Sequence, residues 1–331
     1  MSRTPDAAEA GGEVLEVLRF ESLRPGPRLI VLGAVHGKEP CGPEAIARAV
    51  TEIRAGRPKI RRGCVTFVPV ANPKAWRQRT REGDRNLNRD LCERTHPKNF
   101  EDRVGNRLCA LLREHDVLLD IHSFSARGEP FVFAGPENNQ GEVEPFSNAE
   151  AEWDFAVRLG PSIVMHGWLD GYARFLAERE RLGFAAGGIQ EGVGTTEYMR
   201  FAGGYGATIE CGQHDDPASV EIGYAAILRA LAHLGIVDAP APAVSARRAI
   251  RLTDSLLCGT EGDRLEGFRV TGEAVAAGEV IVRRAGGEAL TAPRPGYLVF
   301  PDPKPLPGKQ LCYFAVASER GTGGPSAASP S

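Results

Sequence analysis

No stretch of eighteen consecutive apolar residues occurs in the 331-residue chain, so we expect no membrane-spanning helix. The N-terminal stretch MSRTPDAAEAGGE lacks the apolar core of a secretory signal, and we therefore expect a cytoplasmic protein with no membrane partner. Neither sign of charge dominates, because 40 Lys and Arg residues stand against 43 Asp and Glu residues, for a net charge of −3. Without an overall positive field, we expect no nucleic-acid partner. Any anion that the protein binds must be held by local side chains.

Short cysteine spacings are also lacking. The chain has seven cysteines, an odd number, and none of them forms a CxxC pair. They are Cys41, Cys64, Cys92, Cys109, Cys211, Cys258 and Cys312. This pattern argues against a disulfide framework and against a thiolate zinc site, and it favours reduced cysteines.

Strand-length apolar runs alternate with helix-length amphipathic stretches along the chain. The apolar runs predict strands at 13–20, 28–35, 64–70, 116–123 and 206–212. The amphipathic stretches predict helices at 42–56, 99–115 and 217–235. Most of the runs are continuously apolar, as expected for strands that are buried on both faces. We therefore predict an α/β fold, with a mixed, largely parallel sheet and helices on both of its faces.

Composition changes near residue 238. Residues 238–246 are rich in Ala and Pro and predict a linker after a main α/β domain at 1–237. Residues 247–318 contain closely spaced turn signals around short apolar runs, which indicates a small β-rich domain. Residues 319–331 have the composition of a disordered tail.

Polar residues that could bind a metal follow the predicted strand at 28–35. In VLGAVHGKEPCG, His36 and Glu39 are three residues apart on the loop after the strand. Ligands in an open α/β sheet bind at the carboxyl ends of the strands, where this loop lies. Catalytic zinc usually takes three protein ligands, and His₂Glu is a common set. An HxxE pair alone is weak evidence, because most such pairs are solvated loop residues.

His122 offers the third ligand, because it closes the strand VLLDIHS at the same kind of position as His36. It lies 83 residues beyond Glu39, a spacing that allows it to come from a neighbouring strand. The other five histidines lie on a polar loop, on helices or at strand ends: His96, His115, His166, His214 and His233. The joint pattern favours a zinc site over the alternative of separate structural histidines.

Glu210 interrupts the apolar strand ATIECGQ, where an ionised carboxylate is costly unless another group compensates it. One interpretation is a buried ion pair with an arginine. The other is a general base beside zinc, which would take a proton from water and pass it to a leaving group.

The segment 72–91 carries many basic residues, with Lys74, Arg77, Arg79, Arg81, Arg85 and Arg89 against three acidic ones. A nucleic-acid track would need more aromatic residues than the single Trp76 and further basic elements. A solvated loop and a site for an anionic substrate both remain open.

Four motifs together resemble the succinylglutamate desuccinylase and aspartoacylase family, which is related to zinc carboxypeptidases. They occur in the family's order between residue 28 and about residue 215: GAVHGKEPCG, NPKAWRQRTREGDRNLNRD, LLDIHS and EYMRFAGGYGATIECGQ. The β-rich C-terminal region resembles the family's smaller second domain less specifically.

The resemblance implies a role for each matching residue. It implies one Zn²⁺ per chain and these site residues: His36, Glu39 and His122 as zinc ligands, Glu210 as the carboxylate that activates water, Arg81 on the scissile carbonyl, Asn88 and Arg89 on the α-carboxylate, and Arg200 on a substrate carboxylate. One departure is Asn86, which stands where family members often have an Asp that orients a zinc-bound His. Tyr297 is the nearest candidate for a C-terminal substrate contact, and no role is carried over to it.

The expected function is a zinc-dependent amidohydrolase that removes an acetyl or succinyl group from a small-molecule N-acyl amino acid, with acidic substrates favoured. Three alternatives remain: deacetylation of a basic N-acyl amino acid such as acetyl-diaminobutyrate, a zinc carboxypeptidase, and a non-catalytic zinc-binding protein. The sequence leaves the oligomeric state open, a homo-oligomer included.

Overall fold

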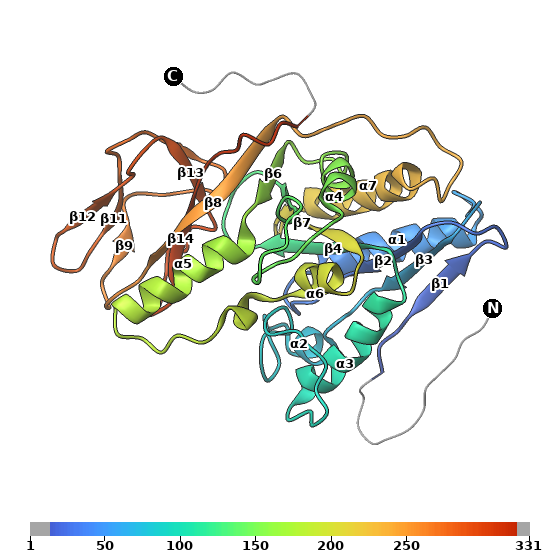
Figure 1. Ribbon diagram of the computed structural model, residues 1–331, viewed down its shortest axis with the longest axis horizontal. Coiled ribbons are helices and arrows are strands. Elements are labelled where there is room, and N and C mark those ends of the chain that lie inside the picture. Colours follow the sequence, from blue (N-terminus) through green and yellow to red (C-terminus); the bar gives the residue numbers. More distant parts are fainter. Residues whose placement is uncertain (1–13, 323–331) are drawn as a thin grey trace.

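The computed structural model describes residues 14–322, and an eleven-stranded mixed sheet runs through the whole molecule (Figure 1). In spatial order its strands are β1 (Leu18–Glu21), β3 (Cys64–Val68), β2 (Arg28–Leu32), β4 (Val117–Phe124), β7 (Tyr205–Gln213), β5 (Phe131–Phe133), β6 (Ile163–His166), β8 (Arg248–Leu257), β14 (Gln310–Ala317), β13 (Gly296–Val299) and β10 (Ala274–Val275). A second sheet contains β12 (Ala289–Thr291), β11 (Val280–Arg283) and β9 (Arg264–Leu265).

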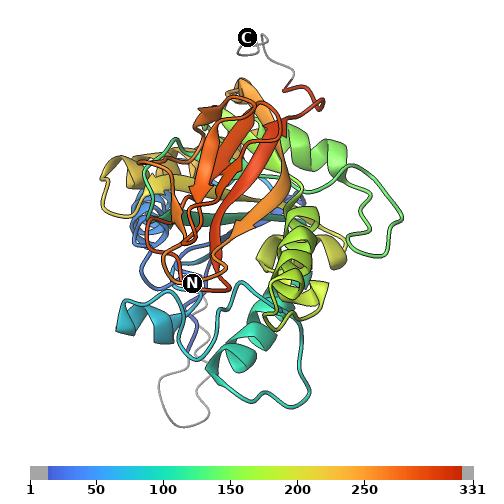
Figure 2. The ribbon, with the colours of Figure 1, turned by 90° about the vertical axis from the view of Figure 1, so that its left-hand side faces the viewer.

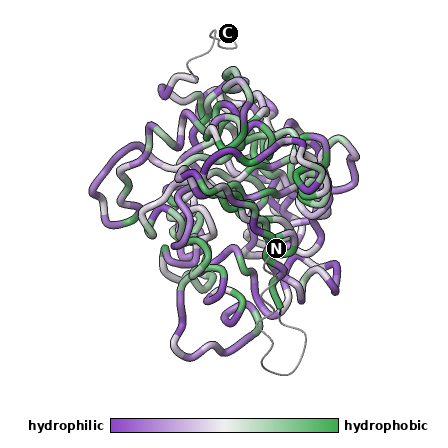
Figure 3. Tube along the Cα trace, turned by 90° about the vertical axis from the view of Figure 1, so that its right-hand side faces the viewer, coloured by the Kyte–Doolittle hydropathy of each residue, from purple (hydrophilic) through white to green (hydrophobic). Residues whose placement is uncertain are grey.

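The helices are α1 (Cys41–Arg54), α2 (Pro73–Gln78), α3 (Phe100–Arg113), α4 (Ala149–Ala156), α5 (Trp168–Arg181), α6 (Thr195–Phe201) and α7 (Ala218–His233), with a 3-10 turn η1 (Ile189–Gly192). One apolar core joins α1, α4 and α7 to one face of the sheet, and another joins α3 and α6 to the opposite face. In Figure 1 these two groups lie above and below strands β2 to β4. Hydrophobic segments gather in the middle of the molecule, and the outlying loops are mostly hydrophilic (Figure 3). The predicted α/β class with helices on both faces is confirmed.

The parallel strands at the centre of the sheet are buried along nearly their whole length. Strands β2, β4 and β7 run parallel as neighbours, and every residue of β3 and β4 is buried. This burial on both faces explains why the sequence shows continuous apolar runs there and not an alternating pattern. Because the three strands run parallel, their carboxyl ends meet at one edge of the sheet.

Helix α5 is an element that the sequence pattern did not predict. Gly171 lies inside it, and glycine lowers the intrinsic preference for helix. The glycine has a packing reason, because a Cβ at position 171 would lie 3.3 Å from the Cβ of Leu252 on strand β8. Tertiary packing against the sheet therefore outweighs local preference in this segment.

The main sheet continues through the boundary that the composition indicated. Strand β8 pairs in parallel with β6, so the C-terminal strands extend the main sheet, as Figure 2 shows from their end of the molecule. The expected linker at 238–246 is held in place, since Arg158 and Arg229 donate hydrogen bonds to the carbonyls of Pro242 and Ala243. Most of the tail expected at 319–331 lies outside the described residues.

Asp263 anchors the turn after β8. Its carboxylate accepts hydrogen bonds from Arg284 at 2.6 Å and from the backbone N–H groups of Gly259 and Ala285 at 2.8 and 2.9 Å. Burial acts to raise the pKa of Asp263, but these hydrogen bonds outweigh it and lower the pKa to about 2.

Because the folded-state pKa of Asp263 is depressed, its contribution to stability is present above about pH 4 and is lost as the pH falls toward 2. Asp263→Asn should lower the free energy of unfolding at pH 7 by about 1–3 kcal/mol. The same change should flatten the acid limb of the pH profile. Urea unfolding between pH 7 and pH 2.5 measures both effects, and an acid limb identical to that of the wild type would refute the assignment.

Candidate metal centre and substrate cleft

The loop that carries His36 and Glu39 is fixed directly after strand β2. The carbonyl of Ala34 accepts a hydrogen bond from the N–H of Asn72 at 3.0 Å, and the N–H of Glu39 donates to the carbonyl of His36 at 3.2 Å. Gly37 is needed between them, because a Cβ there would lie 2.0 Å from a backbone atom of Ala75 in α2. The glycine therefore allows the loop to press against α2.

The structure brings His36, Glu39 and His122 together in a buried cluster. The donor atoms of the three residues lie within 4.8 Å of one another. The two carboxylate oxygens of Glu39 lie 2.9 Å from Nδ1 of His36 and 2.9 Å from Nδ1 of His122. No other such cluster is found among residues 14–322. Two imidazole nitrogens and one carboxylate match a His₂Glu donor set for zinc.

The Nε2 atoms of the two histidines point away from Glu39 toward separate partners. Nε2 of His36 lies 3.1 Å from Oδ1 of Asn86, and Nε2 of His122 lies 2.9 Å from Oδ2 of Asp120. Burial lowers the pKa of His36 to about 3, which favours the neutral ring that a metal ligand needs. Burial acts in the same direction on His122, but Asp120 and Glu39 outweigh it and raise its pKa.

Asp120 contacts the metal cluster, and the sequence pattern did not single it out. It lies two residues before His122 on β4, so both side chains point to the same face of the sheet. A carboxylate on the second nitrogen of a metal-binding histidine fixes the tautomer and raises the basicity of the ligand. The i, i+2 spacing in a strand was the available signal.

Glu210 lies beside this cluster, because β7 pairs with β4 in a register that places it opposite His122. Its Oε2 atom is buried and has no hydrogen-bond partner among the described residues. Burial raises the pKa of Glu210 to about 8, against the opposing charges of His122 and Arg81. The alternative of a buried ion pair is not what the structure shows, since no arginine nitrogen is recorded within 4 Å of Glu210 in the described part of the chain.

The basic segment 72–91 contains α2 and a loop whose residues 83–85 are held by hydrogen bonds, although several of its side chains are exposed. The carboxylate of Glu101, in the first turn of α3, accepts hydrogen bonds from the N–H groups of Gly83, Asp84 and Arg85 at 3.0–3.3 Å. Asp102 follows it and accepts one from Nε of Arg85 at 2.9 Å. These two acidic residues hold the loop on α3. Asp and Glu are common in the first turn of a helix, so the sequence offered no separate sign that these two residues also bind the loop.

Arg81 and Arg89 of this loop reach the metal cluster and the cleft beside it. Nη1 of Arg81 lies 3.8 Å from Oε1 of Glu39. The guanidinium of Arg89 lies over the ring of Trp168, 4.8 Å from its centroid. Asn88 is fixed between them, since its Oδ1 accepts a hydrogen bond from the N–H of Thr195 at 2.9 Å.

These side chains border a cleft of about 1230 Å³ between the strand ends and the C-terminal strands. Apart from the paired residues Arg200 and Glu197, nine Lys and Arg residues line it against five Asp and Glu residues, so its local charge favours an anionic ligand. Aromatic side chains of α5 and the C-terminal region, including Tyr172, Phe300 and Tyr313, form part of the wall. The cleft therefore offers both anion contacts and apolar surface.

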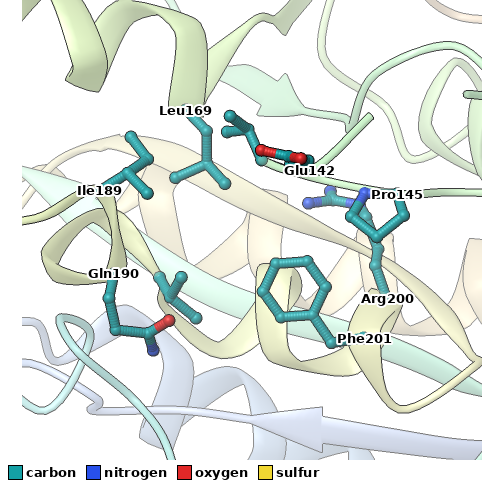
Figure 4. A pocket seen from close by; sticks show the side chains of 9 residues that line it. Glu142, Pro145, Leu169, Ile189, Gln190, Arg200 and Phe201 are labelled. Carbon is teal, nitrogen blue, oxygen red and sulfur yellow. The ribbon is translucent and has the colours of Figure 1, made fainter. Parts of the chain in front are cut away.

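Arg200 lines the cleft as well, but acidic side chains hold its guanidinium. Its side chain is 2% exposed, and its guanidinium forms ion pairs with Glu144 at 2.7 Å, Glu152 at 2.9 Å and Glu197 at 3.2 Å. Figure 4 shows it at the edge of a smaller pocket beside Pro145. Three carboxylates already compensate this charge, so the prediction that Arg200 binds a substrate carboxylate is not supported.

Arg200→Met should be strongly destabilising, because it leaves buried carboxylates without their cation. We expect the free energy of unfolding to fall by about 3–5 kcal/mol, as measured by urea unfolding at pH 7. The exposed Arg54→Met serves as the control and should unfold like the wild type. Wild-type stability in Arg200→Met, with a raised KM, would restore the predicted substrate contact.

Three of the other histidines form hydrogen bonds with hydroxyl groups: His115, His166 and His214.

Within residues 14–322, no helix has the length and apolar character to cross a membrane.

Residues 25–162 match the model of the succinylglutamate desuccinylase/aspartoacylase catalytic domain. This segment contains every residue of the His36, Glu39 and His122 cluster. No curated protein sequence matches the chain.

Several solved structures share the fold. A succinylglutamate desuccinylase/aspartoacylase from Rhodobacter sphaeroides is 18% identical, with a TM-score of 0.70 and coverage of 92% of this chain and 90% of that chain. A succinylglutamate desuccinylase from Silicibacter sp. is 21% identical, with a TM-score of 0.67 and coverage of 92% and 89%. The product-bound ectoine utilization protein EutE (DoeB) from Ruegeria pomeroyi is 20% identical, with a TM-score of 0.65 and coverage of 91% and 88%. Residues 25–162 are therefore similar to the catalytic domain of the succinylglutamate desuccinylase/aspartoacylase family, and the chain shares its fold with these solved structures.

Proposed function

We propose that the protein is a zinc-dependent amidohydrolase that removes an acyl group from an N-acyl amino acid. The observation that carries this proposal is the His₂Glu donor set beside the buried, unpartnered carboxylate of Glu210. The match of residues 25–162 to the desuccinylase/aspartoacylase catalytic domain supports hydrolysis of an acylated amino acid. We also propose a cytoplasmic location, in keeping with seven cysteines that form no disulfide.

The donor set fits Zn²⁺, with Nδ1 of His36, a carboxylate oxygen of Glu39 and Nδ1 of His122 as the residues that would hold it. When bound, zinc lowers the pKa of water toward 7 and polarises a carbonyl group. The three protein ligands leave a position for water and substrate, as in other catalytic zinc sites.

The protein's own residues account for the proton transfers. The Glu210 carboxylate takes a proton from the attacking water, whose oxygen forms the new bond to the carbonyl carbon. Arg81, close to Glu39, faces the developing negative charge on the carbonyl oxygen. Glu210 then gives the proton to the nitrogen as the C–N bond breaks. The products are a carboxylate and a free amino acid.

Asn88 and Arg89 would hold the α-carboxylate of the substrate. With Oδ1 of Asn88 occupied by Thr195, the amide nitrogen of Asn88 is the group that can donate to a carboxylate. The guanidinium of Arg89 lies over the ring of Trp168, a contact that helps to orient its fork.

Arg89→Lys should raise KM by at least about tenfold, because an ammonium group cannot replace a bidentate fork stacked on an aromatic ring. Steady-state kinetics with a single N-acyl amino acid measure this change. The exposed Arg54→Lys is the matched control and should keep wild-type constants. Unchanged KM and kcat in Arg89→Lys would mean that the α-carboxylate is held elsewhere.

The acyl group is proposed as acetyl or succinyl. The basic cleft supports an acidic substrate, although Arg200 no longer contributes to that argument. A carboxypeptidase is less favoured, because C-terminal residues such as Lys309 and Tyr313 form a wall of the cleft and would crowd a long peptide. Deacetylation of a basic amino acid would place its cation in a cleft with excess positive charge.

The test is release of primary amine from a panel of N-acetyl and N-succinyl amino acids with acidic, apolar and basic side chains. The proposal predicts release that a chelator abolishes and zinc restores, with the fastest member naming the substrate class. Cleavage of peptides but of no panel member would favour the carboxypeptidase. No turnover of either, with zinc bound, would favour the non-catalytic alternative.

A further inference from the structure

A continuous set of contacts joins the metal cluster to the substrate-binding loop through one buried threonine. Oγ1 of Thr195, the first residue of α6, donates a hydrogen bond to Oδ2 of Asp120 at 2.5 Å. The same Oδ2 lies 2.9 Å from Nε2 of His122. On its other side, the backbone N–H of Thr195 donates to Oδ1 of Asn88 at 2.9 Å. Thr195 thus contacts Asp120, which lies against the metal ligand His122, and Asn88, which would hold the substrate.

Burial makes the hydroxyl contact important. Asp120 and Thr195 are both 0% exposed, and Oδ1 of Asp120 has no hydrogen-bond partner among the described residues. The Thr195 hydroxyl is therefore the only neutral donor recorded for this carboxylate. Without it, His122 would be the one remaining contact of the Asp120 carboxylate among the described residues, and a buried carboxylate that loses a donor is costly.

Gly194, the residue before Thr195, packs closely against the side chain of Asn88. A Cβ at position 194 would lie 2.2 Å from Oδ1 of Asn88. The N–H of Gly194 in turn donates to the side chain of Glu197 at 2.9 Å, which holds the start of α6. Asn88 can reach the N–H of Thr195 only because residue 194 has no side chain.

We infer that Thr195 is a positioning residue that fixes the His122 metal ligand and the Asn88 substrate contact relative to one another. The hydroxyl orients Asp120, and Asp120 orients the ring of His122. The hydroxyl contact also anchors the start of α6, which sets the position of the N–H that holds Asn88. Neither the zinc donor set nor the α-carboxylate pair includes this residue. The inference rests on the proposed function only for its kinetic readout.

The experiment measures the zinc Kd by chelator competition, and KM and kcat with the best panel substrate, in four variants. Thr195→Val keeps the shape and removes the hydroxyl, and Thr195→Ser keeps the hydroxyl. We expect Thr195→Val to weaken zinc binding by about tenfold and to raise KM severalfold. Thr195→Ser should restore both constants to within about twofold of the wild type. Rescue by serine separates positioning from a general packing defect.

Two further variants serve as controls. One removes a neighbouring hydroxyl, and the other disturbs the substrate side of the site. Thr196→Val removes the neighbouring hydroxyl, which donates to Glu197 at 3.0 Å, and should leave the zinc Kd unchanged. Gly194→Ala should raise KM while leaving the zinc Kd unchanged, because the three atoms nearest to its Cβ all belong to Asn88. If Thr195→Val does not fold, the smaller Thr195→Ala takes its place.

The inference is overturned if Thr195→Val binds zinc as tightly as the wild type, or if its KM is unchanged while zinc binding weakens. The zinc Kd needs no turnover, so it tests the metal half even if no panel substrate is hydrolysed. In that event the substrate half is read from binding of the free amino acids to the zinc-loaded protein, measured by calorimetry. Failure of the proposed function is therefore distinguishable from failure of the inference.

Discussion

Glu210→Gln should lower kcat by about 10²–10⁴ while zinc stays bound. The reason is that glutamine keeps the size of the side chain but cannot take a proton from water or return one to the leaving amine. Its Oε2 position has no hydrogen-bond partner in the described part of the chain, so the substitution disturbs no recorded contact. The measurement is kcat together with the zinc content of the same sample.

Glu82→Gln is the matched control for this prediction. Glu82 is exposed, lines the same cleft and has no role in the proposed mechanism. It should retain wild-type kcat. Retained activity in Glu210→Gln would remove this carboxylate from the mechanism, whereas loss of zinc from that variant would make it a structural part of the metal centre.

His122→Ala should lose the metal and, with it, activity. Removing one of three protein ligands leaves only His36 and Glu39 from the loop after β2, and the buried carboxylate of Asp120 would keep Thr195 but lose its contact with His122. We expect the zinc Kd to rise by at least about 10³. Chelator competition followed by metal analysis of the dialysed protein measures this.

The control is His96→Ala, which removes an exposed histidine that lies outside the metal cluster. It should bind zinc like the wild type. Full zinc occupancy in His122→Ala would place the third ligand on another histidine and would contradict the proposed donor set.

The positions of the site residues at or near the ends of parallel strands explain why the metal cluster could be predicted from the sequence. His36 follows one buried parallel strand, His122 lies near the end of its neighbour, and Glu210 lies on the next strand of the sheet. Parallel strands bring their carboxyl ends to one edge, so three short apolar runs were sufficient to place these residues together. Glu39 came with His36 because only two residues separate them.

The supporting contacts could not be predicted in the same way. Asp120, Glu101 and Thr195 act through burial and long-range partners, which periodicity does not show. Arg200 illustrates the opposite failure, because its position in the sequence resembles a substrate contact, while the fold surrounds it with three glutamates from separate segments. A sequence motif identifies the type of residue, and the fold decides which partner it meets.

The structure shows what Asn86 contacts in place of the Asp that is common in the family. Its Oδ1 lies 3.1 Å from Nε2 of His36 and also accepts a hydrogen bond from the N–H of Asn88 at 2.9 Å. An amide therefore makes the contact that a carboxylate often makes in the family. Without that negative charge His36 is a weaker base, and Asp120 on His122 is the carboxylate that remains beside a ligand.

The most direct test of the central claim is a zinc titration of the metal-stripped protein, with primary-amine release from the best N-acyl amino acid followed at each addition. The account predicts no release without metal and a linear rise that ends at one zinc per chain. Release by the stripped protein, or saturation with zinc that produces no release from any member of the panel, would contradict it.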